Sequence, residues 1–326
     1  LVGSFNIIFS SIILKVKNIE EESKNIFEQD FKELIVKIKN VLELEINTLD
    51  RVILTEDYKN ELELLKEEGI DESFLTYTNN SLGVGIGKSI DFNGKDIVIL
   101  SETFLSMYSD KDTNKSTFNI LAHELAHIDD RNKKNKYIKD FFSEEYANYE
   151  DKVFYPLVKN SWNEFYANYK ASSLLTPLNR NHANDTFFDA LNNFDKNIFD
   201  KKWSYQNRYI SLGEFLDSFR THAYYLFNQA SYLLGNIIGM NYTLDKYLDE
   251  MNCSIKNTIM EETLYTMEKI FNNLIQNYPN KWNGIKELEN LKICLIDYYK
   301  DIGVIFKEVE GQSYVDVKFS KYGHQA

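Results

Sequence analysis

One short motif constrains the fold of this chain more than any other part of its sequence. Residues 114–136 read NKSTFNILAHELAHIDDRNKKNK, in which His123, Glu124 and His127 form the pattern H-E-x-x-H. Residues four apart lie one turn apart on the same face of an α-helix, so both imidazoles can reach one ion. The same stretch carries an apolar stripe made of Phe118, Leu121, Leu125 and Ile128. The pattern predicts a packed helix with a metal-binding face, whose N-cap is Ser116 or Thr117.

Glu124 follows His123 directly and is therefore rotated by about 100° around the helix. That offset places its carboxylate beside an ion rather than on it. Zn²⁺ with three protein ligands keeps one open position and lowers the pKa of a bound water toward about 7. A carboxylate beside that water can act as a general base. The motif therefore predicts one Zn²⁺ ion as cofactor, with His123 and His127 as ligands and Glu124 as the catalytic base.

A third ligand must come from a separate helix. The segment EFYANYK, Glu164–Lys170, is the favoured source because its helix runs into the apolar pair Leu174 and Leu175. Glu164 is the predicted ligand. Asn168 lies one turn later on the same face, where it could bind a ligand imidazole.

A similar segment earlier in the chain provides a rival ligand. The sequence EEYANYE at residues 144–150 shares five of seven residues with EFYANYK at an offset of twenty. Glu144 has the same spacing to its asparagine as Glu164, and Glu145 is a further acid in reach. Sequence alone leaves the choice among these three open.

The two motifs together resemble the ImmA/IrrE-like metallopeptidases, a family within the gluzincins. The resemblance is carried by His123-Glu124-Leu125-Ala126-His127 and by the downstream pattern Glu164-x-x-Ala167-Asn168-x-x-Ala171-x-x-Leu174-Leu175-x-Pro177. It implies that His123, His127 and Glu164 bind zinc and that Glu124 is the base in hydrolysis of a peptide or protein substrate. It covers residues 114–178, about a fifth of the 326. The gap between the motifs is longer than in that family, and no helix-turn-helix is apparent, so no repressor substrate is implied.

A peptidase also needs a group that stabilises the tetrahedral oxyanion. Gluzincins often use a Tyr, His or Arg from a later helix, and FRTHAYYLFNQASYLLGN, residues 219–236, offers several. Tyr225 and His222 are the preferred catalytic candidates. The main alternative function is a non-catalytic zincin-like binding or regulatory module that holds a partner protein. A third reading is an effector directed at a host or a phage.

The remaining pattern predicts a mainly helical α+β fold: a zincin-like core with a small sheet, followed by a helical C-terminal part. We expect a catalytic domain over residues 1–180 and a helical region over 181–326 that packs on or completes the active-site cleft. Local elements predicted from periodicity and turn residues are a helix at about 19–46, a strand at 51–55, a helix at 57–69 closed by Gly69, a hairpin turning at Asn93-Gly94, helices from Leu178 to about Lys300, and a strand near 314–319. Either arm of the hairpin, Val84–Phe92 or Asp96–Ser101, could be the sheet edge that pairs with a peptide.

Composition narrows the class of partner. The chain is 43% hydrophobic and carries a net charge of -13, which favours a sizeable core and argues against a nucleic-acid surface. The apolar residues 1–18 are too short for a membrane helix, although they could be the remnant of an anchor or signal. Cys253 and Cys294 form no disulfide or metal framework. We therefore expect a cytoplasmic protein without stable membrane insertion, whose oligomeric state the sequence leaves unknown.

Overall fold

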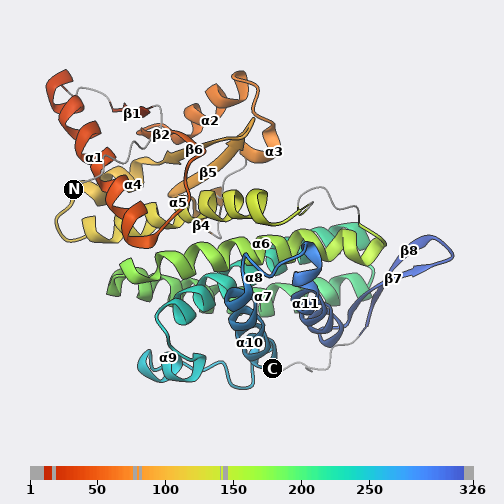
Figure 1. The fold of residues 1–326 in the computed structure, drawn as a ribbon. Coiled ribbons are helices and arrows are strands. Elements are labelled where there is room, and N and C mark those ends of the chain that lie inside the picture. Colours follow the sequence, from red (N-terminus) through yellow and green to blue (C-terminus); the bar gives the residue numbers. More distant parts are fainter. Residues whose placement is uncertain are drawn as a thin grey trace. The chain divides into compact units, whose positions relative to one another are not determined.

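A computed structural model describes residues 11–16, 20–75, 79–80, 83–139, 141 and 146–318 (Figure 1). The chain divides into two compact units by its contacts. The first contains Leu1–Lys133 and Lys170–Arg180, and the second contains Lys134–Tyr169 and Asn181–Ala326. The expected division into a catalytic and a helical domain at residue 180 stays a prediction.

The first unit contains a four-stranded mixed sheet in the order β1-β2-β6-β5. Its strands are β1 (Ser11–Lys15), β2 (Leu49–Thr55), β5 (Gly87–Phe92) and β6 (Lys95–Leu100). The first three in sheet order pair in parallel, and β5 pairs with β6 in antiparallel fashion. A small antiparallel pair is formed by β3 (Asn79–Asn80) and β4 (Gly83–Val84). The helices of this unit are α1 (Glu21–Leu42), α2 (Tyr58–Glu67), α3 (Glu72–Leu75), α4 (Glu102–Ser109) and most of α5 (Asn114–Tyr137).

The hairpin predicted around Asn93-Gly94 is confirmed. Asn93 has φ 54° and Gly94 has φ 76°, so both central residues have the positive φ that a type I′ turn requires. The sheet order also decides between the two proposed edges. The Asp96–Ser101 arm is wrong as an edge, because β6 lies between β2 and β5. The other arm corresponds to β5, which is the last strand of the sheet as described.

The two predicted N-terminal helices form close to their expected bounds. The first, α1, ends at Leu42 rather than near residue 46, since Glu43 adopts φ 52° and its N–H bonds to the Lys39 carbonyl. The second, α2, begins after Asp57, whose side chain accepts a hydrogen bond from the Asn60 N–H at 3.1 Å. Gly69 closes it with φ 97°, a conformation that favours glycine.

The second unit is predominantly helical, as predicted for the chain after Leu178. Its helices are α6 (Tyr149–Ala171), α7 (Pro177–Gln206), α8 (Leu212–Gly239), α9 (Leu244–Glu250), α10 (Glu261–Asn277), α11 (Glu289–Asp301) and the short 3₁₀ helix η2 (Ile285–Leu288). The last residues of α6, the 3₁₀ helix η1 (Ser172–Leu174) and the first residues of α7 belong to the first unit. The predicted late strand is β8 (Gln312–Val317), and it pairs with β7 (Val304–Val309). The mainly helical α+β class is thereby confirmed. None of the described helices combines the length and apolar character that a membrane span needs.

Aromatic packing fixes α6 within the second unit. The Phe165 ring stacks on Phe271 of α10 with centroids 4.1 Å apart, and Trp162 packs on Trp282 at 4.5 Å. Gly235 of α8 lies so close that an added Cβ would be 2.5 Å from the Phe165 carbonyl oxygen. The helix that carries Glu164 is therefore held by α8 and α10.

Candidate metal centre

The motif helix α5 buries the face that the apolar stripe predicted. The side chains of Leu121, Ala122, Leu125, Ala126 and Ile128 are fully buried. The predicted cap at Ser116 or Thr117 is wrong, because the helix begins earlier, at Asn114. Thr117 instead donates its hydroxyl proton to the Asn114 carbonyl at 2.6 Å.

The C-terminal half of α5 is anchored by charged groups. Asp129 is fully buried; its carboxylate accepts the Glu45 N–H at 2.6 Å and the Lys133 ammonium at 2.8 Å. Arg131 donates to Asp96, at the start of β6, at 2.8 Å. These bonds tie the turns after His127 to the sheet and to the loop after α1.

The N-terminal half of α5 is tied to the last residue of α6 and to the segment that follows it. The Asn119 side chain donates to the Ala171 carbonyl at 2.9 Å, and the hydroxyls of Ser116 and Thr176 are bonded at 2.8 Å. Asn119 lies one turn before His123, so α5 is held in place both before His123 and after His127. These hydrogen bonds therefore restrain the backbone that carries the two imidazoles.

Within the second unit, Glu164 lies in the middle of α6. Asn168 donates its side-chain N–H to the Glu164 carbonyl at 2.9 Å. Asn168 thus binds its own helix, and the predicted bond to a ligand imidazole stays a prediction. One turn before Glu164, the Asn160 amide donates to the Asn228 side chain of α8.

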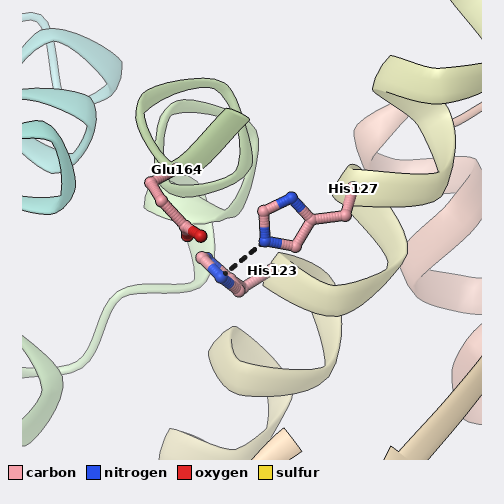
Figure 2. A group of neighbouring side chains, drawn as sticks. All are labelled: His123, His127 and Glu164. Atoms are coloured by element: carbon pink, nitrogen blue, oxygen red, sulfur yellow. Dashed lines mark hydrogen bonds between the residues drawn. The ribbon is translucent and has the colours of Figure 1, made fainter. Parts of the chain in front are cut away.

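Three predicted ligands come together in the structure. Among the described residues, His123, His127 and Glu164 form a group that could hold a metal ion: each offers one ligand atom, and these atoms lie within 4.8 Å of one another. Figure 2 shows the two imidazoles of α5 and the carboxylate of α6 pointing toward a common centre. His123 is buried and the other two are half-buried.

The donor set fits a small divalent cation. The two imidazole Nε2 atoms are 3.0 Å apart and share a hydrogen bond. Two nitrogen ligands of one tetrahedral zinc ion, at bond lengths of about 2.0–2.1 Å, would be roughly 3.3 Å apart. An ion would therefore replace the shared proton with only a small movement of the rings. Both Nε2 atoms must then be unprotonated, so each neutral imidazole would carry its proton on Nδ1.

Glu124 lies beside this group, against the first residue of β5. An added Cβ at Gly87 would be 3.1 Å from the Glu124 Cγ and 3.2 Å from its Oε1. Glu124 is buried, with 7% of its surface exposed. Burial lowers the pKa of Lys88, the next residue of the strand, and the negative charge of Glu124 partly offsets that effect. The carboxylate thus faces the start of the edge strand.

The rival ligands cannot be compared in the same way. Glu144 and Glu145 lie outside the described residues. Glu164 is consequently the acid that the structure groups with the two histidines.

The two oxyanion candidates occupy the N-terminal half of α8. The His222 Nδ1 is 2.8 Å from the Ser218 carbonyl, within its own helix. Tyr225 is half-buried, and burial followed by the charge of Asp189 raises its pKa. Their catalytic roles stay predictions.

Two other tyrosines of α8 emerge as candidates. Tyr224 is 45% exposed, but partial desolvation of its hydroxyl and, second, the negative charge of Glu164 raise its pKa to about 12. Asn228 of α8 bonds to Asn160, while Gly235 lies against α6 just beyond Glu164. The turn of α8 between those contacts is level with Glu164, and it carries Tyr232. The spacing of contacts between two helices reveals this residue, whereas no local sequence signal distinguishes it from its neighbours.

No family model matches the chain, and no curated protein or solved structure matches it.

Proposed function

We propose that the protein is a zinc-dependent metallopeptidase that hydrolyses peptide bonds. The observation that carries the proposal is the group formed by His123, His127 and Glu164, with Glu124 next to it in the sequence. Two histidines and a carboxylate form a ligand set of known catalytic zinc sites, which keep a further position open. The resemblance to the ImmA/IrrE-like metallopeptidases supports the same assignment.

Each residue has a defined role in this proposal. A zinc ion held by the three ligands would lower the pKa of a water molecule and polarise the substrate carbonyl. Glu124 would accept a proton from a water molecule as it attacks the carbonyl carbon, and would return the proton to the leaving amine when the C–N bond breaks. A hydroxyl of α8, from Tyr224, Tyr225 or Tyr232, donates to the developing oxyanion.

The edge strand β5 supports a peptide as the substrate class. One side of β5 bonds to β6, and within the described part of the chain no strand pairs with its other side. An extended peptide can pair with such an edge through its backbone. Glu124 lies against Gly87, the first residue of β5, so a peptide on this edge would pass close to the base.

The metal site is tested first. Metal content per chain, measured by mass spectrometry, should be one zinc for the wild type. It should fall to near zero for Glu164→Ala and stay at one for the matched variant Glu144→Ala. Loss in Glu144→Ala alone would move the third ligand to the rival segment. A wild type that takes up no metal after zinc is resupplied would refute the proposal.

Turnover is tested with the same proteins. A peptide library analysed by mass spectrometry should show cleavage by the wild type and none by Glu124→Gln, which keeps its zinc. Loss of a general base typically costs a factor of about 10²–10⁴ in rate. Unchanged cleavage by Glu124→Gln would rule out the assigned base. A zinc-loaded wild type that cleaves nothing would instead favour a non-catalytic binding module.

A further inference from the structure

Gly87 occupies a crowded position at the start of β5. A Cβ built there would lie 3.0 Å from the Leu100 Cδ2, 3.1 Å from the Glu124 Cγ and 3.2 Å from the Glu124 Oε1. Carbon atoms normally pack at about 3.5–4.0 Å. A side chain at this position would therefore press on the neighbouring strand and on the carboxylate of α5.

The backbone itself does not require glycine here. The glycines with positive φ among the described residues are Gly69, Gly94, Gly284, Gly303 and Gly311. Gly87 has an ordinary strand conformation, paired in register with Leu100. Glycine is unfavourable inside a strand, since it adds no packing and loses more entropy on folding. The space around Gly87 is thus the physical reason for a glycine at this position.

We propose that Gly87 is a positioning residue for Glu124: its missing side chain leaves the space in which the carboxylate lies against the edge strand. The helix that carries Glu124, α5, is anchored on both sides of the motif. The effect on turnover rests on the proposed function, whereas the contact itself does not.

A double-mutant cycle tests the contact without any assay of activity. Gly87→Ala should lower the melting temperature of the apoprotein by about 2–4 °C, the equivalent of overpacking by one methyl group. In a Glu124→Ala background, which lacks both contacting atoms, the same substitution should cost less than half as much. Strand propensity alone predicts the opposite sign, since alanine and especially valine favour strands over glycine. A loss of equal size in both backgrounds would overturn the proposal.

Leu100 needs its own control because it is the nearest neighbour. In a Leu100→Val background, which removes the contacting methyl, Gly87→Ala should retain part of its cost. Complete relief by Leu100→Val would assign the crowding to β6 and overturn the role in positioning Glu124. Gly87→Val should be worse than Gly87→Ala in the wild-type background.

The functional arm uses the zinc-loaded protein. Gly87→Ala should lower kcat by roughly 3- to 10-fold at unchanged zinc content and KM, because a displacement of a few tenths of an ångström mispositions the base. Gly213→Ala, with only the Ser211 Oγ at 3.8 Å from its added Cβ, is the control and should leave kcat unchanged. An unchanged kcat in Gly87→Ala would refute positioning and leave the peptidase intact. If the wild type cleaves nothing, the proposed function fails, and the melting-temperature cycle alone decides the role of Gly87.

Discussion

The close contact between α8 and α6 at Gly235 leads to a quantitative prediction for Gly235→Ala. An added Cβ would lie 2.5 Å from the Phe165 carbonyl oxygen, 2.8 Å from the Asn168 Cβ and 3.1 Å from the Tyr169 nitrogen. Two of these atoms belong to the backbone of a helix, so they cannot rotate away. The methyl group can be accommodated only if α6 and α8 separate.

The magnitude follows from two opposing effects. Atoms that pack best at about 3.5–4.0 Å would have to retreat by roughly half to one ångström. Overpacking of this kind costs about 1–3 kcal/mol, while alanine gains at most about 1 kcal/mol over glycine in helix propensity. Because the shortest contact is with backbone that cannot rotate away, the cost lies at about 2–3 kcal/mol, and the free energy of unfolding should fall by about 1–2 kcal/mol net. The corresponding fall in melting temperature is roughly 2–8 °C.

The assay compares Gly235→Ala with Gly213→Ala, a second glycine of the same helix in open surroundings. Thermal and urea unfolding should show a loss for the first and no loss, or a small gain, for the second. Because Glu164 lies one residue before Phe165, displacement of α6 should also weaken zinc binding in a competition titration with a chelator. Gly213→Ala should bind zinc like the wild type.

One result would refute this reasoning directly. If Gly235→Ala unfolds at the same or a higher temperature than the wild type, α6 and α8 are not held at the distance that the contact requires. If stability falls but zinc affinity is unchanged, the packing argument stands and the link from α8 to Glu164 is wrong.

Two further predictions concern the second unit. Lys202 is 4% exposed and donates to the Ile302 carbonyl at 2.6 Å, and burial lowers its pKa from 10.5 to about 8. Between about pH 8 and pH 10.5 the unfolded chain binds more protons than the folded one, so the free energy of unfolding should rise with pH in this range. Urea unfolding at several pH values should show a smaller rise for Lys202→Met than for the wild type. The same dependence on pH in both proteins would exclude Lys202 as the source of the rise. Ser211 caps α8, since its Oγ accepts the Glu214 N–H at 3.2 Å and Glu214 accepts the Ser211 N–H at 2.8 Å. Ser211→Ala should cost about 1 kcal/mol in thermal unfolding, whereas Ser218→Ala within the helix should change stability by only a few tenths, and equal effects would contradict a capping role.

Local features were predictable because their causes lie within a few residues. The pairing of His123 with His127 follows from helical periodicity, and Asn93-Gly94 specifies its turn through the φ angles that these residues tolerate. Gly69 ends its helix for the same reason. The bounds of such elements were less certain, as the early end of α1 at Glu43 and the early start of α5 at Asn114 demonstrate.

Long-range pairings could not be predicted from local pattern. The pairing of β1 with β2 joins residues that are about forty positions apart in the sequence. Neither strand has a sequence feature that specifies the strand with which it pairs. The sequence leaves β5 and β6 equally suitable as the edge of the sheet. Similarly, Tyr225 and Tyr232 are alike as residues, and only the contacts between α6 and α8 bring the turn with Tyr232 level with Glu164.

The sequence by itself determined the chemistry that one helix can offer: two imidazoles on a single face and a carboxylate beside them. The tertiary structure groups Glu164 of a separate helix with them, a pairing that no local pattern specifies. It also decided where Glu124 lies, against a glycine of a strand 37 residues earlier in the chain. Helical spacing is fixed by backbone hydrogen bonds within a few residues, whereas these groupings depend on how separate elements pack, and packing is a property of the whole chain.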